Sequence, residues 1–103
     1  MSGPGAPADA TLPPAQALQR AVQLHQAGRA VEALPLYAQV LAADAGNLAA
    51  LYYGGVAAWT AGDSELALAR LSSVIALSPQ PVADAHYHRA LAWVALGRDD
   101  EIG

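Results

Sequence analysis

A chain of 103 residues has room for one small domain, which excludes a catalytic domain with a separate substrate-binding lobe. The absence of cysteine excludes a disulfide framework and a thiolate metal site, and the formal net charge of −4 opposes binding to nucleic acid phosphates. Alanine and leucine dominate and phenylalanine is absent, so we expect an all-α fold.

The first thirteen residues are rich in Pro, Gly and Ala and show no apolar periodicity. Such a segment cannot bury enough apolar surface to offset the entropy of ordering it, so we predict a disordered tail over residues 1–13. The tail lacks the basic and apolar regions of a secretory signal, and the uncharged run 45–62 has too short a usable helix for a bilayer. We therefore expect a cytoplasmic protein with neither membrane nor nucleic acid as partner.

After the tail, apolar residues recur at helical spacing in five segments, approximately 14–27, 30–43, 48–61, 64–77 and 82–96. Asn47 and Asp63 precede two of these segments and are predicted N-caps. The links are short, so consecutive helices should fold back as antiparallel neighbours. A glycine follows the end of four segments, where we expect a left-handed residue to terminate the helix: Gly28, Gly46, Gly62 and Gly97.

The second segment contains a local conflict, because Pro35 lies about one and a half turns inside it. A proline there removes a backbone hydrogen bond and can bend the axis, at a cost of up to about 3 kcal/mol. The sequence therefore predicts a second helix that is kinked or starts late.

The segments repeat with a period of 34 residues, which separates Gly28 from Gly62 and Ala33 from Ala67, and a third copy follows after one extra residue. A helix–turn–helix unit of this period resembles the tetratricopeptide repeat. The resemblance rests on small residues within the first helix of each unit, on turn glycines and on early alanines of the second helix. These repeat-packing residues are Ala21, Gly55, Ala90, Gly28, Gly62, Gly97, Ala33 and Ala67.

The resemblance implies antiparallel hairpins stacked as a short right-handed solenoid of five helices over residues 14–103. The repeats would cover about 14–47, 48–82 and 83–103, with the last truncated. In this family the first helices line a concave groove that binds a peptide or protein segment. Carried onto this sequence, the groove residues expected to contact a partner are Tyr52, Tyr53, Val56, Trp59, Tyr87, His88, His25 and Gln26.

The aromatic residues of this groove allow two interpretations. Tyr and Trp are enriched at binding hot spots, whereas aromatic stripes on helices also arise from packing between neighbouring repeats. The chain has no lysine and Asn47, its only asparagine, is in a turn. It therefore does not resemble the family members that grip a C-terminal carboxylate.

Two adjacent glycines, Gly54 and Gly55, fall inside the third helix, where each costs about 1 kcal/mol relative to alanine. Gly55 occupies the small position of the repeat, and we expect it to let the helices of one hairpin approach closely at Ala67. Gly54 aligns with Arg20 and Arg89, so the repeat does not require it, and it should leave a hollow whose role stays open.

An enzyme is the competing class of function. Asp84 and His88 are spaced as an orienting carboxylate and a base on one helix face, but His86 and His88 point to different sides and cannot share a metal ion. No nucleophile or phosphate-binding loop accompanies them. We therefore expect no enzymatic activity, no cofactor and no metal.

The chain ends within the first turn of an expected sixth helix, so the fifth helix lacks a mate. Two hypotheses follow. In the first, the chain is a piece of a longer repeat array, such as the N-terminal part of a larger bacterial glycosyltransferase or sulfotransferase. In the second, it forms a homodimer through the fifth helix. In both, the chain is a protein–protein interaction adaptor or scaffold. The residues expected at a self-association surface are Leu91, Trp93, Val94 and Leu96.

Overall fold

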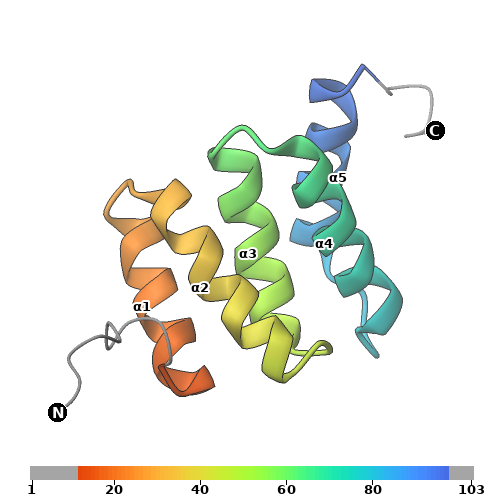
Figure 1. Ribbon diagram of the computed structural model, residues 1–103. Helices are drawn as coiled ribbons and strands as arrows, with labels where there is room; N and C mark the ends of the chain where they lie inside the picture. Colours follow the sequence, from red (N-terminus) through yellow and green to blue (C-terminus); the bar gives the residue numbers. More distant parts are fainter. Residues whose placement is uncertain (1–11, 98–103) are drawn as a thin grey trace, which may run out of the picture.

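The computed structural model describes residues 12–97, and within them it contains five α-helices and no strand. The helices follow one another along the molecule, and each folds back on the one before it (Figure 1). Every boundary lies within one residue of the predicted segment, so the all-α prediction is confirmed. The helices are α1 (Pro14–Gln26), α2 (Ala30–Ala43), α3 (Leu48–Thr60), α4 (Ser64–Leu77) and α5 (Ala83–Ala95).

The predicted disordered tail, residues 1–13, lies outside the described residues except for its last two. Leu12 is half-buried and packs against the first core cluster, and Pro13 is the N-cap residue of α1. The ordered domain therefore includes two residues that the sequence assigned to the tail. The predicted truncated start of a sixth helix, after Gly97, also lies outside the described residues.

Three helix ends carry a glycine in the left-handed region, with φ of 80° at Gly28, 90° at Gly62 and 74° at Gly97. The same prediction for Gly46 is wrong, because its φ is not positive. The chain leaves α2 one residue earlier than a stop at Gly46 requires, because Asp44 is the C-cap residue, with φ of −148° and ψ of 86°. A separate turn then leads to the start of α3.

The starts of α3 and α4 are set by side-chain caps at the predicted residues. The backbone N–H of Ala50 donates to Asn47 Oδ1 at 2.9 Å, and that of Leu66 donates to Asp63 Oδ1 at 3.1 Å. Each cap satisfies an N–H group that has no partner within its helix and stabilises that helix by about 1 kcal/mol. The two caps fix the residues at which α3 and α4 begin.

The second helix runs through Pro35 without interruption. The backbone N–H groups of Glu32 and Ala33 donate to the Arg29 carbonyl at 3.1 and 3.2 Å, so the first turn forms ahead of the proline. A late start of this helix, one of the two predicted consequences, is therefore wrong. Pro35 is exposed, so the Val31 carbonyl that it leaves unbonded lies on the solvent side of the helix.

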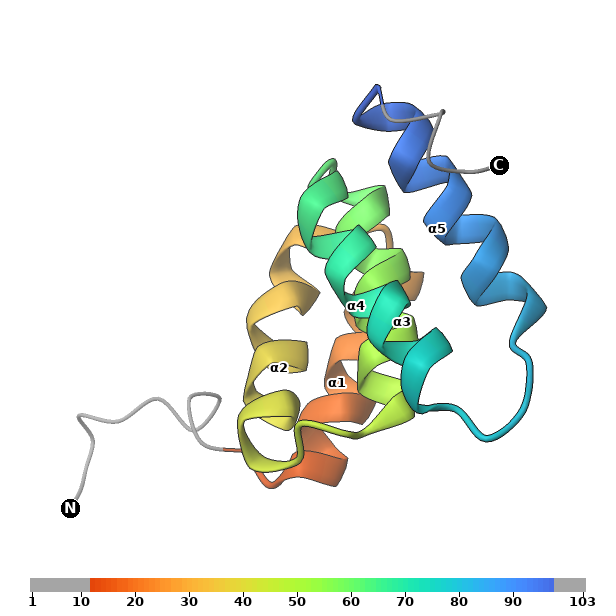
Figure 2. The ribbon, with the colours of Figure 1, turned by 90° about the vertical axis from the view of Figure 1, so that its right-hand side faces the viewer.

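Packing joins mainly consecutive helices, while α1 with α3 and α3 with α5 share smaller contacts. Nearest-neighbour packing of this kind characterises solenoids of helical repeats. One core cluster surrounds Tyr37 and Val40 of α2, and a second surrounds Leu71 and Val74 of α4. The helices α2 and α4 lie on one side of the molecule and α1, α3 and α5 on the other (Figure 2).

Gly55 allows the close approach of α3 to α4. A Cβ atom there would lie 2.8 Å from Leu71 Cγ and 2.9 Å from Leu71 Cδ2, which is closer than real Cβ contacts. The predicted need for a small residue therefore has a steric basis, but the partner is Leu71 and not Ala67. Leu71 lies one helical turn beyond Ala67, and its longer side chain extends over the α3 backbone.

Gly54 does not border a hollow, contrary to expectation. A Cβ atom there would lie 3.0 Å from Arg70 Nη1 and 3.2 Å from Tyr37 Cβ and Cγ. Side chains from α2 and α4 thus meet over Gly54 and fill the space. Arg70 of the same hairpin brings a cation to the position where Arg20 and Arg89 stand in the other repeats.

Two polar atoms are buried in this inter-repeat contact without a hydrogen-bond partner among the described residues, Tyr37 Oη and Arg70 Nη1. Burial raises the pKa of Tyr37 to about 12. The neighbouring Tyr53 contributes to this increase, whereas the positive charge of Arg70 opposes it. Burial likewise lowers the pKa of the half-buried Arg70. The contact therefore favours a protonated phenol and carries a desolvation cost.

We expect this phenol to make the stability depend on pH above about 10. Between about pH 10 and 12 the unfolded chain ionises Tyr37 while the folded chain keeps the proton, so the free energy of unfolding falls as pH rises. Urea unfolding of the native protein and of Tyr37→Phe at pH 9, 10 and 11 tests this. The difference in the free energy of unfolding between the two proteins should change by up to about 1.4 kcal/mol per pH unit above 10. A constant difference would contradict the prediction.

Candidate functional site

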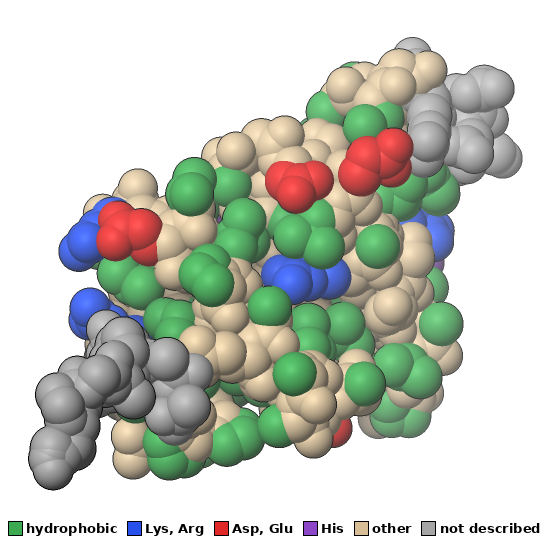
Figure 3. All heavy atoms as spheres, in the orientation of Figure 1, with side chains coloured by type: hydrophobic (Ala, Val, Ile, Leu, Met, Phe, Trp, Pro, Cys, Tyr) green, Lys and Arg blue, Asp and Glu red, His purple; other side chains and the backbone are tan. Residues whose placement is uncertain are grey.

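The first helices of the repeats share one side of the molecule. Direct contacts join α1 to α3 and α3 to α5, although each of these pairs is separated by a full helix in the sequence. The opposite side, which carries α2 and α4, shows hydrophobic, basic and acidic side chains dispersed over its surface (Figure 3). Equivalent positions of α1, α3 and α5 therefore form a continuous surface.

Five ring side chains meet on this surface where α3 approaches α5. The His88 ring lies edge-to-face with three of them, at centroid distances of 6.3 Å to Tyr52, 6.2 Å to Trp59 and 5.3 Å to Tyr87. Tyr52 makes the same kind of contact with Tyr53 at 5.3 Å. Such pairs stabilise by about 0.5–1.5 kcal/mol beyond their buried area. We call this set the aromatic cluster: Tyr52, Tyr53, Trp59, Tyr87 and His88.

The cluster divides into supporting and exposed rings. Tyr52 and His88 are half-buried, whereas Tyr53, Trp59 and Tyr87 are 45%, 36% and 62% exposed. The half-buried rings join two repeats, as the packing interpretation requires. The exposed rings offer contact area to solvent, as the groove interpretation requires. The packing interpretation therefore fits the half-buried rings of the aromatic cluster, and the groove interpretation fits the exposed ones.

The orientation of His88 is set by its own helix. Its Nδ1 lies 2.8 Å from the main-chain carbonyl oxygen of Asp84, and since a carbonyl only accepts, Nδ1 carries the hydrogen. In the neutral ring Nε2 is then the acceptor. The enzymatic alternative required the Asp84 carboxylate to orient this ring, but the main chain does so.

The surroundings of Tyr52 disfavour ionisation of its hydroxyl. Burial raises its pKa, and the negative charge of Asp84 and the neighbouring Tyr53 add to the effect. A phenol is protonated through the neutral range at its ordinary pKa of about 10, and the raised pKa of Tyr52 extends that range upward.

The other predicted groove residues continue this surface from α3 toward α1. His25 Nε2 lies 3.5 Å from Thr60 Oγ1, and the Thr60 hydroxyl donates to the Val56 carbonyl at 3.0 Å. Val56 is half-buried, and Gln26 is exposed at the last position of α1. These residues are uncharged polar or apolar, so the surface extends without a fixed charge.

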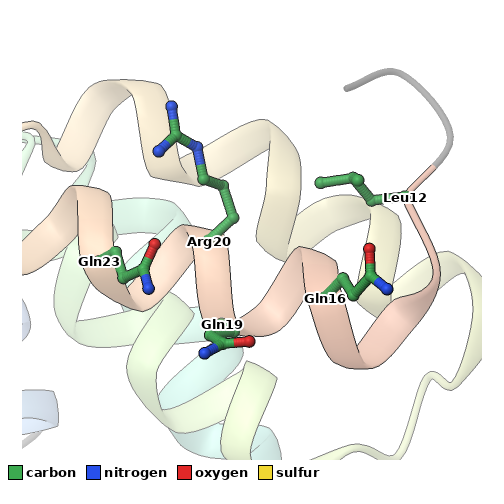
Figure 4. A pocket seen from close by; sticks show the side chains of 5 residues that line it. All are labelled: Leu12, Gln16, Gln19, Arg20 and Gln23. Carbon is green, nitrogen blue, oxygen red and sulfur yellow. The ribbon is translucent and has the colours of Figure 1, made fainter. Parts of the chain in front are cut away.

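A shallow depression lies elsewhere on α1, away from the aromatic cluster (Figure 4). The side chains there are exposed, except for half-buried Leu12, and uncharged, except for one arginine. They are Leu12, Gln16, Gln19, Arg20 and Gln23. None of the eight groove residues expected to contact a partner lines this depression.

Residues 12–97 were compared with two further classes of feature, a metal site and a membrane span, and match neither. Within them no group of three or more His, Cys, Asp or Glu side chains is placed to hold a metal ion. Every helix in this part of the chain is too short or too polar to span a bilayer.

A family model for the tetratricopeptide repeat matches residues 24–94, more than half of the chain. The chain belongs to the tetratricopeptide repeat family. A search of curated proteins finds no match to it. Tetratricopeptide repeats are a non-catalytic fold that generally mediates protein–protein interaction. The family assignment drawn from the 34-residue period is thereby confirmed.

In this tetratricopeptide repeat chain, the matched residues include the whole aromatic cluster. One feature beside it escaped sequence reasoning, the contact of Arg70 with Gly54 and Tyr37. A signal existed in the alignment of the repeats, since Gly54 stands where the other two carry arginine. What the alignment did not reveal is that the missing cation is supplied by the next helix.

Proposed function

We propose that this protein is an interaction adaptor or scaffold that binds a peptide or protein segment over the aromatic cluster. The observation that supports the proposal is the joint exposure of Tyr53, Trp59 and Tyr87 on the side formed by the first helices. Contacts with half-buried Tyr52 and His88 hold the rings in place before a partner arrives. Rigid aromatic side chains lose little entropy on binding and often dominate interface energetics.

The chemistry of the groove residues favours a partner recognised by apolar contact and hydrogen bonds. None of the predicted contact residues is Asp, Glu, Lys or Arg, while the tyrosine hydroxyls, the Trp59 indole and His88 supply hydrogen-bonding groups. Binding should therefore depend only weakly on salt, because screening acts on pairs of charges.

The proposed adaptor has no catalytic activity or cofactor of its own and acts in the cytoplasm, for which the cysteine-free composition is suitable. The alternative, an N-terminal part of a larger bacterial glycosyltransferase or sulfotransferase, assigns the same task to the groove. In that case the bound segment would recruit or position the enzyme.

A library of random linear peptides selected on the immobilised protein tests the proposal. Tyr53→Ala and Trp59→Ala together should lower the affinity for the selected peptides by about 30-fold or more, the loss typical of a binding hot spot. Val31→Ala is the matched control, because Val31 is 67% exposed on α2, outside the groove. Equal binding by the groove variant and the control would exclude the aromatic cluster as the binding surface.

The same variants separate binding from packing. Tyr53 and Trp59 are exposed, so their loss should leave helical content and melting temperature nearly unchanged. Tyr52 is half-buried, so Tyr52→Ala should weaken both binding and stability. A strong drop in the melting temperature of Tyr53→Ala alone would assign that ring to the core.

A further inference from the structure

The aromatic cluster carries hydrogen-bonding groups that the protein itself does not use. Within residues 12–97 no hydrogen bond engages the phenol hydroxyls of the cluster or the indole N–H of Trp59. The indole N–H can only donate, and each phenol can donate one hydrogen. At His88 the donor nitrogen is already bonded to the Asp84 carbonyl. A partner rich in hydrogen-bond acceptors can therefore engage all of the unused groups.

The charges around the cluster do not favour an acidic partner. None of the five cluster residues is Asp, Glu, Lys or Arg. Burial and then the negative charge of Asp84 raise the pKa of Tyr52, so an acidic segment would meet an unfavourable field there. A basic segment could stack on the rings through cation–π contacts, and the experiment below separates that case.

The common backbone conformations of a bound segment differ in the acceptors that they offer. A strand adds to an exposed sheet edge, and residues 12–97 contain no strand. A helix uses its carbonyl groups internally, so most of them are not available to the phenols and the indole. A polyproline II segment has no internal hydrogen bonds, and its prolines bring free carbonyls but no N–H group. Its apolar rings also pack well in grooves lined by aromatic side chains.

The spacing of the rings along α3 matches the repeat of a polyproline II helix. Tyr52 and Trp59 are seven residues apart, so they share one face of α3 and lie about 10 Å apart along its axis. Both rings contact His88, at 6.3 and 6.2 Å. A polyproline II helix has three residues per turn and returns to the same face after about 9 Å. Prolines three residues apart can thus pack on Trp59 and on the tyrosine pair at the same time.

We infer that the aromatic cluster binds a proline-rich segment in the polyproline II conformation. One proline packs on Trp59 and another, three residues away, packs on Tyr52 and Tyr53. Tyr87 flanks the site on the side of α5, because its exposed ring contacts His88 at 5.3 Å. The inference rests on the proposed function, since it names the class of segment that the groove takes. A preformed polyproline II segment loses little entropy on binding, which favours it over a flexible one.

The second tryptophan of the chain is not an equivalent site. Trp93 is half-buried, and the guanidinium carbon of Arg89 lies 4.5 Å from its ring centroid, so one ring face is occupied. The other residues predicted for self-association are aliphatic, one exposed and two half-buried: Val94, Leu91 and Leu96. Trp93→Phe therefore leaves Trp59 as the only tryptophan and as a fluorescent reporter of the cluster.

Titration of the Trp93→Phe chain with capped decaproline tests the inference. The Trp59 emission should move to shorter wavelength as prolines displace water from the ring, with saturation below about 1 mM peptide. A capped decapeptide of alternating Gly and Ser is the control and should bind at least about tenfold more weakly. An equal response to the two peptides would overturn the inference.

The placement of the prolines is tested with two-proline peptides in the same Gly/Ser background. Prolines three residues apart should bind about tenfold more tightly than prolines two residues apart, which point to different sides of a polyproline II helix. Equal affinities would contradict the match between the rings and the three-residue repeat.

A variant in the otherwise native chain checks the site. Trp59→Ala should lower the affinity for fluorescein-labelled decaproline about tenfold or more, whereas Val31→Ala on α2 should not change it. Both positions are exposed, so circular dichroism should show native helical content in both variants. If Trp59→Ala bound decaproline as tightly as the control variant, the inferred contact would be wrong.

Capped decalysine separates the basic alternative. If decalysine bound more tightly than decaproline, and lost that affinity between about 0.05 and 0.5 M salt, the site would belong to a basic segment and the inference would fail. Decaproline binding should change little over the same range, because no pair of charges is involved.

The peptides selected from the random library separate this inference from the proposed function. Peptides that depend on Tyr53 and Trp59 should be enriched in proline and displaced by decaproline. If they depend on these rings but lack proline and resist displacement, the polyproline class is wrong and the adaptor proposal stands. If no selected peptide depends on the cluster, both fail.

Discussion

Replacing Tyr37 with alanine is expected to lower the free energy of unfolding by about 3–5 kcal/mol, the usual cost of removing a large buried ring. Replacing it with phenylalanine should instead raise that free energy by about 1 kcal/mol. Tyr37 is fully buried and packs over Gly54 beside Arg70, so its ring carries much of the contact between the two repeats. Its hydroxyl is buried without a partner among the described residues, so its removal ends a desolvation cost.

Chemical denaturation of the three proteins at pH 7 measures both effects. The informative result is that the two substitutions change the free energy of unfolding in opposite directions. If the site simply tolerated no substitution, both variants would be less stable than the native protein. If Tyr37→Phe lowered the free energy of unfolding by more than about 1 kcal/mol, the hydroxyl would make a hydrogen bond. The inference that it has no partner would then be wrong.

The second large effect is expected at Gly55. Gly55→Ala should lower the free energy of unfolding by about 1–3 kcal/mol, although alanine is the better helix former by about 1 kcal/mol. The reason is steric, because the added Cβ would lie 2.8 Å from Leu71 Cγ, a branch point inside a fully buried side chain. The backbone of α3 or α4 must then move.

Gly54→Ala is the matched control in the adjacent position of the same helix. Its added Cβ would meet the end of the Arg70 side chain at 3.0 Å and Tyr37 carbons at 3.2 Å. Arginine can move its tip, and the helix propensity of alanine offsets part of the crowding, so we expect stability within about 1 kcal/mol of the native protein. Thermal unfolding of both variants ranks them.

A double-mutant cycle identifies the partner of Gly55. In a Leu71→Ala background the penalty of Gly55→Ala should vanish, because the clashing atoms are gone, leaving a coupling energy of about 1–3 kcal/mol. Crowding against Ala67, the partner expected from the sequence, would instead leave the penalty intact in that background.

Gly55 also connects the fold to the proposed function. It lies on α3 between Tyr53 and Trp59, two exposed rings of the aromatic cluster. One side of α3 packs tightly on α4 through this glycine, while another side presents the rings and meets α5. A change in the α3–α4 distance would therefore move the rings relative to His88.

The sequence by itself determined the helices, their limits and the family. Three signals can be recognised directly in the sequence, because they act locally or between equivalent positions. They are the spacing of apolar residues, the Asn47 and Asp63 caps and the 34-residue period. Sequence reasoning failed at Gly46, because α2 had already ended at Asp44, and in the expected late start of α2, because the first turn of that helix forms ahead of Pro35.

Only the tertiary structure decided which side chains meet across helices. Periodicity shows which face of a helix is inward, but the reach of a side chain over the neighbouring backbone depends on how deeply the helices pack. For that reason Gly55 contacts Leu71 instead of Ala67, and Arg70 fills the space over Gly54. The gathering of the rings around His88 likewise follows from the contact of α3 with α5, which joins residues that lie 36 apart in the sequence, as Tyr52 and His88 do.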